Sequence, residues 1–82
     1  MNKYTAEEIV AATEKARARL DQHPEDPQLV MWVLPDDLAK EAEVYDLVYC
    51  LRHDTCTRAD VLGVIEYLER YTADLTTEEE GR

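Results

Sequence analysis

The sequence has few of the residues that interrupt helices. Only 2 glycines and 3 prolines occur among 82 residues, and phenylalanine is absent. Because glycine and proline are the residues least compatible with a helix interior, their scarcity favours helix throughout. The 2 cysteines are too few for a disulfide framework, so reduced thiols are expected.

Segments that would direct a chain to or across a membrane are also missing. No apolar run follows Lys3 as it would in a signal peptide, and no stretch approaches the length of a membrane span. We therefore expect a cytoplasmic protein with no membrane partner.

The common motifs of catalysis are absent as well. The chain has no glycine-rich phosphate loop, no G-x-S-x-G elbow and no H-E-x-x-H pair. Acidic pairs such as Glu7 and Glu8 would need an enclosing cleft to act as acid and base, and a helical bundle of this size rarely forms one. The sequence thus predicts a protein that is not an enzyme and needs no cofactor.

Positive charge is scarce relative to negative charge. With 19 acidic and 9 basic residues, the formal net charge is −10 at pH 7. Such a charge opposes direct binding to nucleic acids and to anionic membranes, and it favours attraction to basic protein surfaces.

What is present is enough apolar sequence for one folded domain. Apolar residues make up 45% of the chain, which is too many for intrinsic disorder. We expect a single helical domain over residues 1–75 and a mobile acidic tail over residues 76–82.

Two capping signals predict helix starts. Thr5 with Glu8, and Thr57 with Asp60, have the spacing of a capping box. The first helix should end near Gln22, before Pro24. The final helix has a buried face with helical spacing, formed by Val61, Val64, Ile65, Leu68 and Leu75.

The run from Leu29 to Leu34 is apolar without periodicity. A short helix is favoured, because Asp26 and Pro27 suit a helix start and Pro35 a stop. A short strand remains the alternative. Either element should be buried.

Residues 36–52 read as one helix with apolar side chains on two faces. One stripe consists of Val44, Leu47, Val48 and Leu51, and the other of Leu38, Ala42, Tyr45 and Tyr49. Together they span an arc of about 220°, wider than packing on one core requires. The predicted fold is an all-α bundle of three longer helices and one short helix, with a surplus apolar face that favours a homodimer.

This surplus face is the predicted site for a protein partner. Tyrosine, tryptophan and methionine are enriched in interface cores, and surrounding acids steer a basic partner. The predicted partner-binding residues are Met31, Trp32, Leu38, Ala42, Tyr45 and Tyr49. The predicted steering residues are Asp36, Asp37, Glu41, Glu43 and Asp46.

A possible metal site is the C-x2-H-x2-C group of Cys50, His53 and Cys56. A continuous helix would separate the two thiols, and only His23 and Asp54 suggest themselves as a fourth zinc ligand. The prediction is that no metal is bound. Acidic surroundings should also raise a thiol pKa, which argues against catalysis by cysteine.

In size, acidity and helicity the chain resembles the small inhibitors that bacteriophages deploy against host machinery, including anti-CRISPR proteins. The resemblance implies an inhibitor that binds and occludes a host protein in the host cytoplasm. Two alternatives stay open. One is an acidic mimic of nucleic acid, and the other is a regulatory or structural homodimer.

Overall fold

The computed structural model describes the backbone of residues 4–80 and the side chains of residues 4–76. This part of the chain is all-helical, as the sequence predicts. Its helices are α1 (Ala6–Gln22), α2 (Gln28–Val33), α3 (Asp36–Glu41), α4 (Tyr45–His53) and α5 (Arg58–Glu80).

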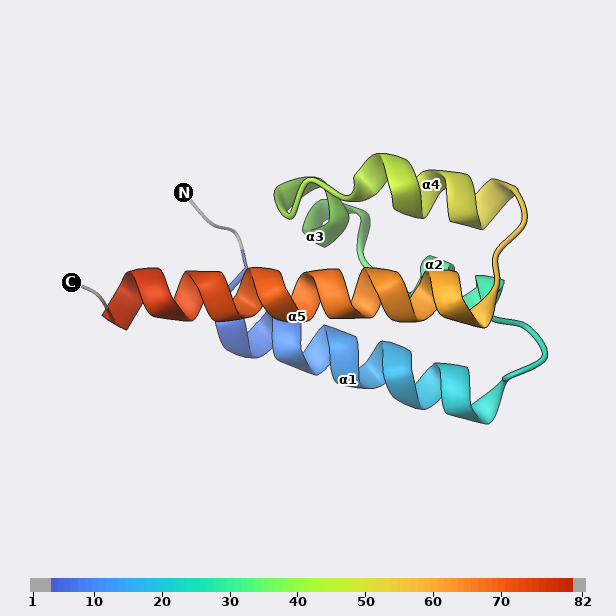
Figure 1. Ribbon diagram of the computed structural model, residues 1–82, viewed down its shortest axis with the longest axis horizontal. Coiled ribbons are helices and arrows are strands. Elements are labelled where there is room, and N and C mark those ends of the chain that lie inside the picture. Colours follow the sequence, from blue (N-terminus) through green and yellow to red (C-terminus); the bar gives the residue numbers. More distant parts are fainter. Residues whose placement is uncertain (1–3, 81–82) are drawn as a thin grey trace.

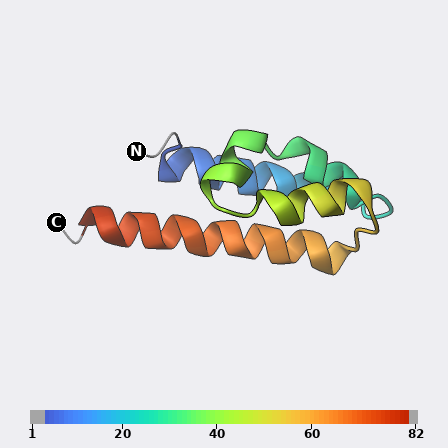
Figure 2. The ribbon, with the colours of Figure 1, turned by 90° about the horizontal axis from the view of Figure 1, so that it is seen from above.

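The two long helices, α1 and α5, lie side by side and run antiparallel (Figure 1). The three short helices, α2 to α4, form a second layer over this pair, and we call them the cap. Figure 2 shows the cap from above. The molecule is elongated, with extents of 43 × 23 × 17 Å.

Both predicted capping boxes are confirmed. The Glu8 amide donates to Thr5 Oγ1 at 3.1 Å, and the Thr5 amide donates back to Glu8 Oε1 at 3.0 Å. At the start of α5 the corresponding distances between Thr57 and Asp60 are 3.2 and 2.9 Å. Each long helix therefore begins where local sequence chemistry places it.

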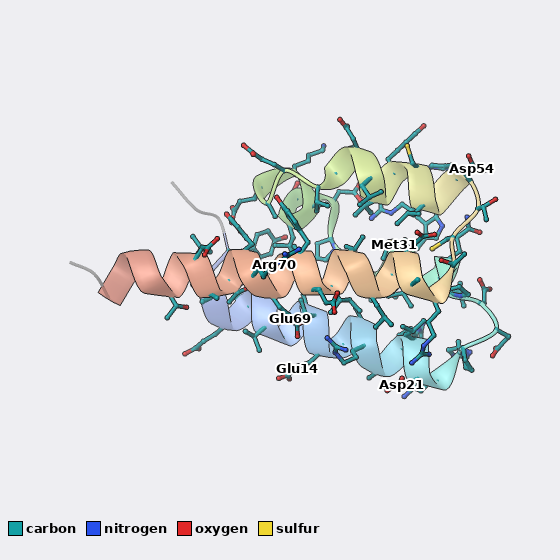
Figure 3. All side chains as sticks on the ribbon, viewed as in Figure 1. Glu14, Asp21, Met31, Asp54, Glu69 and Arg70 are labelled. Carbon is teal, nitrogen blue, oxygen red and sulfur yellow. The ribbon has the colours of Figure 1, made fainter. Side chains whose placement is uncertain are left out.

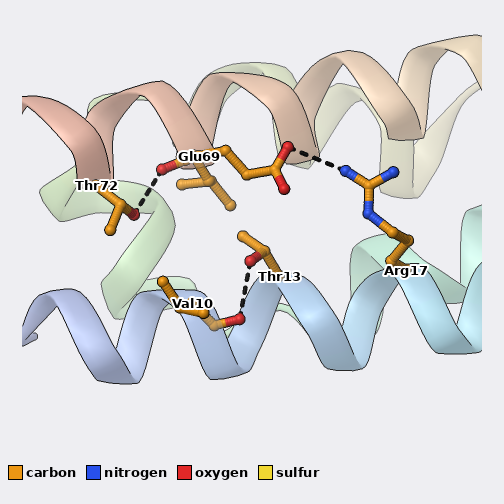
Figure 4. Close-up of polar contacts among 6 residues, drawn as sticks. Val10, Thr13, Arg17, Glu69 and Thr72 are labelled. Atoms are coloured by element: carbon orange, nitrogen blue, oxygen red, sulfur yellow. Dashed lines mark hydrogen bonds and ion pairs between the residues drawn. The ribbon is translucent and has the colours of Figure 1, made fainter.

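The predicted apolar face of α5 is buried against α1 and the cap. Two threonines are also buried, and their hydroxyls donate to carbonyls of their own helices. Thr13 donates to Val10 O at 2.9 Å and Thr72 to Leu68 O at 2.8 Å (Figure 4). Arg17 and Glu69 bridge the two helices at 3.0 Å, but both are half exposed. Such a surface pair contributes little stability, typically under about 1 kcal/mol.

The predicted acidic tail begins within α5. The helix continues past Leu75 to Glu80, so part of the predicted tail is helical. Residues 81 and 82 lie outside the described residues. The mobility expected for residues 76–82 stays a prediction.

The helical interpretation of the apolar run is confirmed by α2, but its complete burial is wrong. Val30 and Met31 are buried, whereas Leu29 is 40% and Trp32 54% exposed. A helix this short has one face on the core and one toward water. Asp26 also does not cap it, since Pro27 takes the cap position without a side-chain hydrogen bond.

The single helix predicted over residues 36–52 is wrong, because the chain turns at Glu43. There φ is 60°, the left-handed region in which helices commonly end. The Glu43 amide donates to Lys40 O at 3.1 Å, and the Val44 amide donates to Ala39 O at 2.8 Å. This pair of hydrogen bonds is a Schellman motif, and glycine, its usual residue, is missing.

The turn replaces one long helix by α3 and α4, so the bundle has two long helices and three short ones among its described residues. The 220° arc disappears with it. Leu38 and Ala42, expected on the surplus face, are 0% and 2% exposed and belong to the core. The described structure contains one chain, and dimerisation stays a prediction.

Candidate functional site

The anchor of the cap is Arg52, a buried arginine near the end of α4. Its Nε donates to Met31 O at 2.7 Å and its Nη2 to Leu34 O at 2.8 Å. These carbonyls lie at the end of α2, where the helix leaves them without intrahelical partners. Nη1 pairs with Asp36 in the first turn of α3 at 2.5 Å. One side chain thus ties three helices together.

Two further side chains hold the ends of short helices from a distance. The Gln28 amide nitrogen lies 3.0, 2.8 and 2.7 Å from the carbonyl oxygens of Leu51, Arg52 and Asp54, at the end of α4. From α5, the Tyr67 hydroxyl donates to Ala42 O at 2.6 Å, beside the Glu43 turn. The position of α4 is therefore fixed by contacts distant in sequence.

On this framework four rings from α2 and α4 form a continuous surface, which we call the aromatic row. It consists of Trp32, His53, Tyr49 and Tyr45. Ring centroids are 5.2 Å apart for Trp32 and His53, 4.5 Å for His53 and Tyr49, and 6.1 Å for Tyr49 and Tyr45. Trp32 and Tyr49 remain 54% and 51% exposed.

Cations lie at both ends of the aromatic row. The Arg52 guanidinium is 5.0 Å from the Trp32 ring centroid, and Lys40 Nζ is 5.0 Å from that of Tyr45. Both distances suit a cation–π interaction. The rings are thus held by their neighbours, which reduces the rotamer entropy that a partner would have to remove.

The predicted partner-binding residues separate into two groups. Trp32, Tyr45 and Tyr49 come together on the row. Met31, Leu38 and Ala42 are buried, because they pack between the cap and the long helices. They support the surface from beneath and offer no area to a partner.

The predicted steering acids have different surroundings. Asp36 is occupied with Arg52, and the Glu41 carboxylate accepts the Tyr4 amide at 3.3 Å. Asp36 is nevertheless exposed, as are Asp37, Glu43 and Asp46, whereas Glu41 is half-buried. Electrostatic steering by any of them stays a prediction.

Sequence reasoning missed the roles of Arg52 and His53. The only functional role that the sequence suggests for His53 is zinc ligation, although its spacing of four from Tyr49 and eight from Tyr45 puts it on their helix face. The sequence carries no comparable signal for Arg52, whose acceptors are the carbonyls of another helix.

The zinc hypothesis finds no support among residues 4–76, where no group of three or more His, Cys, Asp and Glu side chains could hold a metal ion. The absence of bound zinc stays a prediction. Burial raises the pKa of the Cys56 thiol, and the nearby carboxylates of Asp60 and Asp26 raise it further. Cys50 is exposed.

No helix in the described part of the chain is both long and apolar enough to cross a membrane. Comparison with known proteins found no matching family model, no matching curated protein and no matching solved structure.

Proposed function

We propose that this chain is a non-enzymatic protein-binding module that docks a partner through the aromatic row. The observation that carries this proposal is the exposure of Trp32 and Tyr49 within a set of mutually contacting rings. Exposed tryptophan and tyrosine in fixed positions are the residues that most often dominate binding energy at protein interfaces.

The mode of action we propose is occlusion of a basic surface on a host protein, as in the phage inhibitors that the chain resembles. A net charge of −10 accelerates encounter with a basic partner, and the rings then hold it. In this mode of docking, charge speeds the encounter and the rings provide the affinity. In electrostatic mimicry of nucleic acid, carboxylates would provide both.

The experiment compares binding by the parent protein and by matched variants. Partners are captured from a bacterial lysate with the parent, Tyr49→Ala, Trp32→Ala and, as a control, Val10→Ala, which removes an exposed apolar side chain from α1. Any captured protein is then purified and its dissociation constant measured. Loss of an anchor should weaken binding about tenfold or more, whereas the control should bind like the parent.

The only tryptophan of the chain is Trp32, so its fluorescence reports on the aromatic row without labelling. Docking should shift its emission to the blue as the exposed indole leaves water. If folded Tyr49→Ala and Trp32→Ala variants bind as well as the parent, the docking surface is wrong. If carboxylate neutralisation and salt dominate instead, mimicry is the better description.

Measurements of oligomeric state test the homodimer alternative at the same surface. If a second copy covers the aromatic row, light scattering should give a dimer at micromolar concentration. A Tyr49→Glu variant should then be monomeric with unchanged helical circular dichroism. A monomeric parent protein at all concentrations would leave a foreign partner as the occupant.

A further inference from the structure

A groove of about 570 Å³ separates α4 from α5. Its apolar lining includes the buried side chains of Val44, Leu51 and Val64, and Leu47, which is 50% exposed, projects at its edge. The walls are two helices that run antiparallel (Figure 1). It is therefore an apolar groove between two helices, of the kind in which a third helix can pack.

The groove and the aromatic row use opposite flanks of α4. At about 100° per residue, Leu47 and Leu51 lie roughly 200° around the helix from Tyr45 and Tyr49. The exposed strip of α4 between these two flanks bears Asp46 and Cys50, and we call it the crest. Occupation of the groove is thus a second interaction, separate from the proposed function.

Gly63 opens the groove on the side of α5. A Cβ atom added at this position would meet nothing within 4 Å, so no packing within the chain requires the glycine. Glycine in a helix interior costs about 0.8–1.0 kcal/mol relative to alanine. The missing side chain does, however, let an incoming helix approach α5 closely, and Ala59 one turn earlier does the same.

The rim of the groove is mainly acidic. Glu43 and Asp46 border it from the cap, and Asp60 borders it from α5. Among the described residues, Arg70 is the one basic residue in the lining. It lies on the side of α5 that faces α3 and α4, while Glu69 faces α1 (Figure 3). Lysine and arginine on an occupant would meet these carboxylates, whereas a second copy of this chain would bring its own net charge of −10.

From this geometry we propose that the α4–α5 groove is a docking site for a basic amphipathic helix of a partner protein. The nine-residue α4 is about 14 Å long, which matches two to three turns of an occupying helix. Apolar residues spaced by three or four would fill the space beside Leu47 and Gly63. Basic residues flanking them would pair with the acidic rim.

The test is a selection from displayed random peptides of about 16 residues, a length sufficient for four helical turns. Binders to the parent protein are screened against Leu47→Glu, which puts charge in the groove, and against Gly63→Gln, which fills it. Tyr49→Ala, on the opposite flank of α4, is the matched control. Circular dichroism checks that each variant is folded.

The expected result is a class of binders with apolar residues at helical spacing and an excess of lysine and arginine. Their synthetic peptides should lose about tenfold or more in affinity on Leu47→Glu and Gly63→Gln, and almost none on Tyr49→Ala. Replacing their basic residues by glutamate should abolish binding. Raising the salt concentration should weaken binding.

Three results would overturn the proposal. Binders could be insensitive to both groove variants, or groove-dependent binders could lack the basic amphipathic pattern. Alternatively, Leu47→Glu could convert a dimeric parent to a monomer, which would assign the groove to a second copy. None of these results bears on Tyr49 and Trp32, so this proposal and the proposed function fail separately.

Discussion

The starts of the long helices and the arrangement of the cap are fixed by different kinds of hydrogen bond. At the starts of α1 and α5, each capping hydrogen bond joins residues three apart in the sequence. In the cap, Arg52 reaches carbonyls 21 and 18 residues away, and Tyr67 of α5 reaches a carbonyl of the cap 25 residues away. The starts of the two long helices depend on local sequence, whereas the arrangement of the cap depends on contacts between residues distant in sequence.

This difference matters because the aromatic row belongs entirely to the cap. Helices of six and nine residues are too short to be stable alone, so the row exists only while Arg52 and its partners hold α2 and α4. Loss of these contacts would remove the binding surface before it disrupts the long helices.

The largest expected effect comes from Arg52→Ala. It leaves the buried carbonyls of Met31 and Leu34 without their donors and should reduce the free energy of unfolding by about 3 kcal/mol. Urea denaturation measures the loss. Hydrogen exchange should accelerate most in α2 and α4.

Arg17→Ala is the matched control, because it removes an arginine from a half-exposed ion pair on the long-helix pair. Its cost should stay below about 1 kcal/mol. Equal losses for the two arginine variants would show that Arg52 stabilises the cap no more than Arg17 stabilises the long-helix pair.

A smaller effect is expected for Thr57→Ala, which removes the capping hydroxyl at the start of α5. The cost should be about 1 kcal/mol, and Thr57→Ser should retain most of the stability because it keeps the hydroxyl. The change in melting temperature on thermal unfolding measures both. A destabilisation as large as that of Arg52→Ala would show that a local cap contributes as much to stability as the long-range contacts of Arg52.

Glu43→Gly and Gly63→Ala should each stabilise the protein, by roughly 0.5–1 kcal/mol. Glu43→Gly places glycine in the turn where φ is 60°. Gly63→Ala removes glycine from a helix position with open space around it. Chemical denaturation of both single variants and the double variant measures the gains. Destabilisation by Glu43→Gly would mean that its side chain matters more than its backbone strain.

The fold was predictable from sequence wherever the signals were local. Thr5 and Thr57, each with an acid three residues later, give the starts of α1 and α5, and apolar spacing gives the α5 face. The division between α3 and α4 was not predictable, because Ala42, Glu43 and Val44 include no glycine or proline. The turn there is imposed by packing and by the Tyr67 hydroxyl.

The candidate site was predictable in part for the same reason. Tyr45 and Tyr49 were identified by their spacing of four, and Trp32 by its residue type. The burial of Leu38 was missed because it follows from the turn at Glu43. The groove between α4 and α5 also could not be foreseen, since it requires the relative position of two helices far apart in the chain.

The smallest expected effect concerns thiol reactivity and leaves stability unchanged. Cys50 is exposed, whereas burial and two carboxylates raise the pKa of Cys56. Because the thiolate is the nucleophile, iodoacetamide should alkylate Cys50 first, and alkylation of Cys56 should require higher pH. Mass spectrometry of timed samples measures both rates. Faster modification of Cys56 at neutral pH would show that its loop opens readily.

The crest of α4 offers a natural attachment point for a probe. Cys50 lies between the aromatic row and the groove, so a small fluorophore or spin label placed there reports on both flanks without an engineered cysteine. A partner that enclosed α4 from both flanks would immobilise the label and protect the thiol. A partner on one flank alone would leave the label mobile, so its rotational freedom would reveal how much of α4 a bound protein covers.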